Sequence, residues 1–193
     1  LPKATDAKTY KVGYKFIPDD KDNYISSEPL FISVKIAQLE RSLKWSDTVL
    51  VYNSNEQKPT AELKDVLEGD VVSVVVDGAQ TKVNTGYIAT ATELSGTDAK
   101  NYVIAGEVTK KFSIIKSDKK DYTAPTAIED LVYKGRKQEL LKAGVEGNIK
   151  GNFKYVLGAG PEVDTVPSVK EADEYSVGYR FMPEDDGYMP SEL

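Results

Sequence analysis

Two acidic loops hold the residues with the most obvious capacity for chemistry. PDDKDN at 18–23 and PEDD at 183–186 each follow an aromatic, apolar run. Carboxylate oxygens are the ligands that Ca²⁺ prefers, so Asp19, Asp20 and Asp22 are candidate calcium ligands. The first loop lacks both the glycine at the sharp turn and the bidentate glutamate that complete a calcium loop. We therefore favour solvated turns over metal sites.

Catalysis finds little support in the composition. The 193 residues include no His and no Cys, which excludes thiol nucleophiles, imidazole acid-base chemistry and Cys or His metal sites. Glycoside hydrolysis needs two carboxylates held across a cleft, and 31 Asp and Glu residues supply such pairs by chance. We expect no enzymatic activity and no cofactor.

Two further features are candidates for binding or crosslinking. Trp45, the one tryptophan, lies in LKWSD, where apolar and polar residues do not clearly alternate. It is expected to be partly exposed, and it is the candidate for stacking on a sugar or a protein. An internal Lys–Asn isopeptide bond would need a buried lysine, and Lys35, Lys116 and Asn101 are its candidate members.

The charge balance restricts the possible partners. A net charge of −6 with scattered Lys and Arg argues against nucleic acids, whose phosphates require a positive surface. No apolar stretch is long enough to span a membrane, so we expect no membrane insertion in this segment.

Internal repetition organises the chain. YKVGYKFIPDD at 10–20 returns as YSVGYRFMPED at 175–185, with seven of eleven positions identical. LVYNSNEQ at 50–57 returns as LVYKGRKQ at 131–138, and DKDNYI at 20–25 as DAKNYV at 98–103. The ISVKI that ends the first copy corresponds to FSIIK at 112–116. The sequence therefore predicts three copies of one module.

The copies set the predicted boundaries. Residues 1–37 form the C-terminal half of a module, 38–118 a complete module, and 122–193 a third module without its last strand. We call these the first, middle and third copies. Residues 117–126 have the charge, Thr and Pro content of a short linker.

Each module is predicted to be all-β. In YSVGYRF the residues Tyr175, Val177, Tyr179 and Phe181 alternate with polar or small residues, as in a half-buried strand, and YKVGYKF repeats the pattern. Further strands are expected within 30–36, 48–52, 59–64, 71–78, 86–94 and 108–116, and the DAKNY segment is expected to form a tight or helical turn that Asp and Asn cap. Modules of about 80 residues suit a small β-sandwich, with a β-grasp-like sheet as the alternative.

The LVYNSNEQ, GYIATATELSGTDAKNYVI and FSIIK stretches resemble the tandem MBG-type and Ig-like repeats of bacterial, Firmicutes-like cell-surface proteins. One departure is Ser54, where such repeats carry Gly. The resemblance implies an Ig-like fold and an extracellular, non-catalytic array that acts as a stalk or spacer. An adhesin module that binds a host glycan or protein, or an ancillary module of a secreted glycoside hydrolase, is the alternative.

The unequal copies raise one further hypothesis. The first copy has the last strand that the third lacks, and the third has the early strands that the first lacks. Copies of the chain are therefore expected to complete one another head to tail by strand complementation, forming a fibre.

Overall fold

The computed structural model describes residues 1–193 and contains no α-helix. Short strands make up several small sheets, and a single 3₁₀ turn, η1 (Ala99–Asn101), is the only helical element. The all-β prediction is therefore confirmed.

The chain divides into two compact units. Unit 1 contains Leu1–Thr48, Lys58–Ala79 and Gly86–Phe112, whereas unit 2 contains Val49–Gln57, Gln80–Thr85 and Ser113–Leu193. The three-copy boundaries rest on sequence similarity and remain a prediction beside this division.

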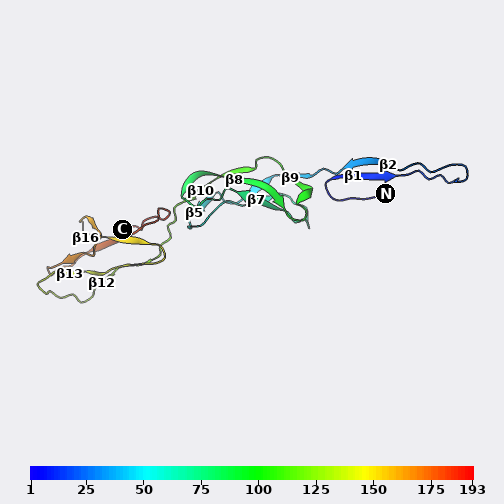
Figure 1. Cartoon of the computed structure of the whole chain (residues 1–193). Coiled ribbons are helices and arrows are strands. Elements are labelled where there is room, and N and C mark those ends of the chain that lie inside the picture. The colour runs from blue at the N-terminus through cyan, green and yellow to red at the C-terminus, as the bar shows by residue number, and fades with distance from the viewer. The chain divides into compact units, whose positions relative to one another are not determined.

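A two-stranded hairpin opens unit 1. The antiparallel strands β1 (Thr9–Tyr14) and β2 (Leu30–Lys35) pair from Thr9 opposite Lys35 to Tyr14 opposite Leu30 (Figure 1). Tyr10 and Val12 are half-buried, but Tyr14 is 51% and Phe16 69% exposed. The prediction that this face packs on a core is wrong at those two positions, because a sheet of only two strands has no second layer to cover them.

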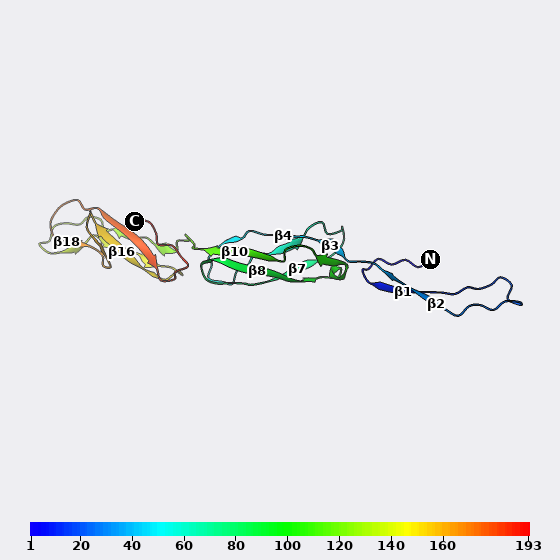
Figure 2. The same ribbon diagram turned by 90° about the horizontal axis from the view of Figure 1, so that it is seen from above.

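Residues 38–118 contain eight of the strands. These are β3 (Leu39–Arg41), β4 (Leu43–Trp45), β5 (Val49–Val51), β6 (Ala61–Leu63), β7 (Ser73–Asp77), β8 (Asn84–Ser95), β9 (Tyr102–Ile104) and β10 (Thr109–Ile115). The largest sheet has the order β5-β10-β8-β7, of which Figure 2 labels β10, β8 and β7, and β3-β9 and β4-β6 form separate pairs. The buried apolar residues that these strands give to unit 1 are Ala61, Val76, Ala89, Ala91, Tyr102 and Phe112. The strands expected from the sequence in this region are all present.

Residues 122–193 contain the remaining strands. These are β11 (Tyr122–Thr123), β12 (Thr126–Ala127), β13 (Gln138–Glu139), β14 (Leu141–Lys142), β15 (Val145–Glu146), β16 (Gly151–Leu157), β17 (Glu162–Val163), β18 (Ser168–Val169) and β19 (Val177–Pro183). The main sheet has the order β17-β16-β19. Its core is aromatic: Phe181 is buried, stacks on Tyr122 at 4.9 Å and lies 5.2 Å from Phe153. At Phe181 the predicted inward face of this strand is confirmed, because Tyr122 and the cross-strand neighbour Phe153 cover its ring.

The repeat is visible in local geometry as well as in sequence. In the first copy Ser27 donates its N–H to the Phe16 carbonyl at 3.1 Å and accepts the Phe16 N–H at Oγ at 3.0 Å. Ser191 makes the same two bonds with Phe181, at 3.0 and 2.8 Å. The same pair of bonds therefore closes the loop after the strand in both copies, although the loop of the third copy is one residue shorter.

The LVY loop also repeats. Gln57 Nε2 donates to the Val51 carbonyl at 2.9 Å, and Gln138 Nε2 donates to the Val132 carbonyl at 3.0 Å. Ser54 and Gly135 occupy the same loop position and both have positive φ, 66° and 70°. The middle copy thus holds a serine in a backbone conformation that favours glycine.

This conformation allows a direct test. Gly135→Ala is expected to lower the free energy of unfolding by about 1 kcal/mol, because a Cβ is unfavourable in the left-handed region even where space is free. The space around Gly135 is open, so the cost is backbone strain alone. Urea denaturation measures it, with neighbouring Lys134→Ala as the control, expected to change stability by less than about 0.5 kcal/mol. Equal stability of both variants would contradict the left-handed assignment.

Candidate functional site

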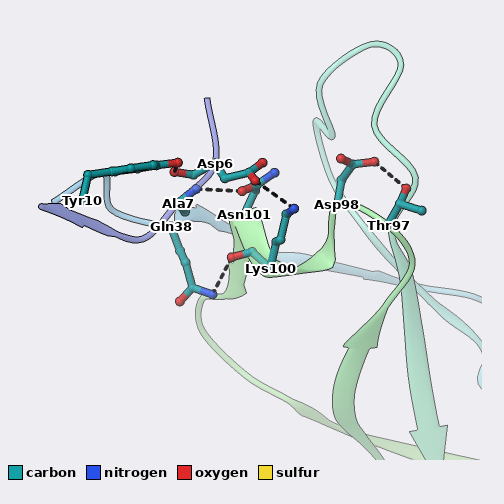
Figure 3. A network of polar contacts seen from close by, with 8 residues as sticks. All are labelled: Asp6, Ala7, Tyr10, Gln38, Thr97, Asp98, Lys100 and Asn101. Carbon is teal, nitrogen blue, oxygen red and sulfur yellow. Dashed lines mark hydrogen bonds and ion pairs between the residues drawn. The ribbon is translucent and has the colours of Figure 1, made fainter. Parts of the chain in front are cut away.

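The most developed polar site of unit 1 joins the segment before β1 to the η1 turn (Figure 3). Lys100 Nζ lies 2.9 Å from Asp6 Oδ2, and the Ala7 N–H donates to Asn101 Oδ1 at 2.8 Å. Gln38 Nε2 donates to the Lys100 carbonyl at 3.1 Å. The site therefore ties two chain segments that are far apart in sequence, and we call it the η1 junction.

The η1 turn presents these side chains because Asp98 holds it in place. Asp98 Oδ2 accepts the Val71 N–H at 2.9 Å and the Thr97 hydroxyl at 2.8 Å. These bonds, the one from the Val71 N–H foremost, keep the pKa of Asp98 below its ordinary value. The helical turn predicted for DAKNY is confirmed, but the predicted side-chain cap is absent, because Asp98 bonds the distant Val71 N–H and Asn101 bonds the Ala7 N–H instead of the turn's own backbone.

Tyr102 fixes the turn to the core. It is buried, its hydroxyl donates to Asp70 Oδ2 at 2.6 Å and accepts the Leu67 N–H at 3.0 Å. Burial, with the bond to Asp70, raises the pKa of Tyr102. The expectation that the tyrosine after the turn folds onto a core is confirmed in the middle copy, whereas Tyr24 at the same place in the first copy is exposed.

A groove of about 370 Å³ adjoins the η1 junction, between the end of β2 and the turn. Asp6, Asp70 and Asp98 line it, but each of these carboxylates already accepts a bond or ion pair from a protein group. No group of three or more acidic side chains is arranged to hold a metal ion anywhere in the structure. The η1 junction therefore joins the segment before β1 to the η1 turn through charge-assisted hydrogen bonds.

The η1 junction is expected to depend on pH. The hydrogen bond from Lys100 lowers the pKa of Asp6, so the bond stabilises the junction above the ordinary pKa of an aspartate and is lost as the pH falls through the lowered value. Asp6 also raises the pKa of Lys100, so the same bond is lost again at strongly alkaline pH.

Protection of the Ala7 amide against hydrogen exchange should therefore be constant between about pH 5 and 9 and fall below pH 4. Asp6→Asn should lose this acid-dependent step, whereas Asp19→Asn should keep it; an unchanged pH profile in Asp6→Asn would contradict the assignment.

The calcium candidates do not converge. Asp20 accepts the N–H groups of Asp22 and Asn23 at Oδ1, at 3.2 and 3.1 Å, and the Asn23 side chain at Oδ2. These bonds, led by the one from the Asn23 side chain, lower the pKa of Asp20. Asp19, Asp20 and Asp22 form no metal-holding group with one another or with other carboxylates. Asp20 caps a turn, as the solvated-turn interpretation expects.

The other sequence candidates lie apart from the junction. Trp45 ends β4 opposite Ala61 and is half-buried, in line with the partial exposure expected for it. Lys35 and Lys116 are exposed, and the Asn101 side chain is bound to the Ala7 amide. An isopeptide bond needs a buried lysine, so these residues do not meet its requirement.

Unit 2 contains a second junction that sequence reasoning missed. Tyr52 donates its hydroxyl to Asp185 Oδ2 at 2.6 Å and meets the Tyr188 ring edge-on at 5.3 Å, and Ser54 Oγ lies 3.0 Å from the Tyr188 hydroxyl. The bond to Asp185 raises the pKa of Tyr52. Ser117, which is buried although it begins the predicted linker, donates its N–H to the Gly187 carbonyl at 2.9 Å. We call this contact the Tyr52 junction.

The two junctions share one design. In each, the turn before a tyrosine in one copy receives a segment of another copy. The DAKNY turn receives Asp6 and Ala7, and the shorter DDGY turn at 185–188 receives Tyr52 and Ser54. The recurrence of the turn was readable from sequence. Its partners were not, because they belong to different parts of the module in the two cases.

Comparison of the chain with protein-family models, curated proteins and solved structures finds no match. Among the elements of the structure, no helix has the length and apolar character needed to cross a membrane.

Proposed function

We propose that this chain is a non-catalytic, extracellular repeat segment that acts as a stalk or spacer of a bacterial surface protein. The observation that carries the proposal is the pair of junctions. At each one, side chains and backbone of one repeat copy bond directly to the turn of another, so the copies are held by specific contacts as well as by the covalent link. A spacer needs such coupling, because freely hinged modules would not hold a distance.

The extracellular location and the relation to MBG-type or Ig-like tandem modules rest on the sequence resemblance. The absence of Cys means that no disulfide contributes to stability, and short polar contacts take part of that role. The involvement of all the groove carboxylates in protein contacts supports a structural rather than a catalytic role.

Nitrogen-15 relaxation tests the coupling. If the junctions hold, the hairpin β1–β2 should show the same rotational correlation time as the middle copy, and Asp6→Asn combined with Asn101→Ala should release it. Asp19→Asn combined with Asn23→Ala, in the exposed hairpin loop, is the matched control. A hairpin that tumbles independently in the unaltered protein would overturn the spacer proposal.

An adhesin module is the second candidate. The half-exposed Trp45 and the exposed rings of Tyr14, Phe16 and Tyr24 are surfaces on which a glycan or a protein could stack. Binding on a glycan array that Trp45→Ala abolishes and Tyr24→Ala preserves would favour this candidate. An array without signal would favour the spacer.

A further inference from the structure

Strand β2 has one unpaired edge. It pairs only with β1, and all six of its residues are exposed, among them Leu30, Phe31, Ile32 and Val34. An exposed apolar edge strand is a template for pairing with another chain. The hairpin therefore presents both the hydrogen-bonding groups and the side chains that an added strand would need.

The middle copy shows which strand belongs on this edge. By sequence, β10 corresponds to β2, with Ile114 in the place of Val34 and Ile115 in the place of Lys35. One edge of β10 pairs with β8 and the other pairs in parallel with β5, Leu50 opposite Ile114 and Val51 opposite Ile115. The Tyr52 N–H then donates to the Ile115 carbonyl at 2.9 Å.

The counterpart of β5 in the third copy is Leu131–Tyr133, and it has no strand partner. These residues belong to no strand, and their exposed fractions are 41%, 68% and 56%. Their loop nevertheless keeps the form of the paired one, since Gln138 holds the Val132 carbonyl as Gln57 holds that of Val51. The segment is thus shaped for a strand partner, so little further ordering is needed when it pairs.

We propose that Leu131–Tyr133 of one molecule adds as a parallel strand to the free edge of β2 in a second molecule. The register follows the middle copy, with Leu131 opposite Val34 and Val132 opposite Lys35. The proposal deepens the structural role given above, on which it rests, by naming a second copy of this chain as the partner. The Leu131–Tyr133 segment and the free edge of β2 are different surfaces of the molecule. A molecule that binds a neighbour through one of them still has the other free, so the contact repeats and builds a head-to-tail fibre.

The groove at the η1 junction suits the next residue of the incoming strand. Tyr133 corresponds to Tyr52, whose ring packs at the turn of residues 185–188. The groove lies beside Ile36 and Ala37, directly after β2, and it is lined by Asp98 and Asn101 of the corresponding turn. Its volume of about 370 Å³ accommodates a tyrosine ring. The phenol of Tyr133 therefore enters it when the strands pair.

Proline substitutions separate the free edge from the paired edge. The Ile36 N–H donates to the Lys8 carbonyl, so along β2 the N–H groups of Phe31, Ser33 and Lys35 point away from β1. In the register given above the Lys35 N–H donates to the Leu131 carbonyl of the partner, so Lys35→Pro removes that bond while it spares the β1–β2 ladder. In the middle copy the Tyr52 N–H points toward β10. By the same alternation the N–H groups of Leu131 and Tyr133 point toward β2 of the neighbouring molecule, and Leu131→Pro removes one of them.

Sedimentation velocity from micromolar to millimolar concentration gives the test. The unaltered protein should increase in average mass with concentration, and Lys35→Pro and Leu131→Pro should each be monomeric. Mixed in equal amounts, the two variants should form a dimer and nothing larger, since each retains one intact surface. A monomer at all concentrations for the unaltered protein, or an assembly that either proline leaves intact, would overturn the proposal.

Disulfide trapping covers the case in which a proline variant unfolds. The chain has no Cys, so any crosslink reports the introduced pair. Val34→Cys and Leu131→Cys proteins, mixed and oxidised, should give a mixed disulfide dimer, whereas Val34→Cys with exposed Glu107→Cys should not; equal yields would overturn the register. A protein that stays monomeric but whose hairpin tumbles with the middle copy would refute the fibre proposal and agree with the spacer proposal. A protein that self-associates but whose hairpin tumbles independently would refute the spacer proposal and agree with the fibre proposal.

Discussion

Replacing Phe112 by alanine is expected to lower the free energy of unfolding of the middle copy by about 3–5 kcal/mol. Phe112 is 2% exposed in β10, and its ring lies 5.5 Å from that of Tyr87. Removal of the ring leaves a cavity that the surrounding short strands cannot fill, so both the transfer energy and the packing are lost. Urea denaturation followed by the fluorescence of Trp45, the one tryptophan, reports on this copy directly.

The repeat supplies the matched control. Ile32 occupies in β2 the place that Phe112 occupies in β10, but it is 54% exposed. Ile32→Ala should therefore change the free energy of unfolding by less than about 0.5 kcal/mol in a dilute sample. A similar loss at both positions would mean that the hairpin is covered by a layer that the structure does not contain.

The same comparison explains how far sequence reasoning reaches. Period-two alternation placed β1, β2, β19 and five strands of the middle copy correctly, because alternation is local, but it did not predict β3, β4, β9 or β16. It assigned an inward face to Tyr14 and Phe16 as readily as to Tyr179 and Phe181, but burial depends on a second layer that a hairpin lacks. The alternation pattern could not reveal that difference.

The candidate site also has parts that the sequence predicted and parts that it did not. The turn after Asp98 was predictable, because Asp and Asn favour tight turns. The bond from the Val71 N–H to the Asp98 carboxylate was not, because the two residues are far apart in the chain. The ion pair of Lys100 with Asp6 and the bond of Tyr52 with Asp185 join residues far apart in the chain, and neither pair has a local sequence signature. The acidic loop at 183–186, first considered as a possible metal site, instead contributes Asp185 to the Tyr52 junction.

Gly187→Ala is expected to disrupt the Tyr52 junction and to lower the free energy of unfolding by about 1–3 kcal/mol. A Cβ at Gly187 would overlap the ring of Tyr52, so the ring must move away from Asp185 and Tyr188. The pKa of Tyr52 is raised by the bond to Asp185 and should return toward its ordinary value in the variant. Carbon-13 NMR titration of the tyrosine ring carbons measures that change.

Gly178, a second glycine of the same copy, is the control. It distinguishes steric overlap with a ring from the general effect of adding a methyl group. At Gly178 in β19 the added Cβ would lie 3.4 Å from the Leu193 side chain, an ordinary contact. Gly178→Ala should therefore leave the titration of Tyr52 unchanged and lower stability little or not at all, because alanine restricts the unfolded chain. If the two variants behave alike, or if Tyr52 keeps its raised pKa in Gly187→Ala, then the ring does not pack on Gly187. The turn would in that case hold its partner through the backbone bonds of Ser117 alone.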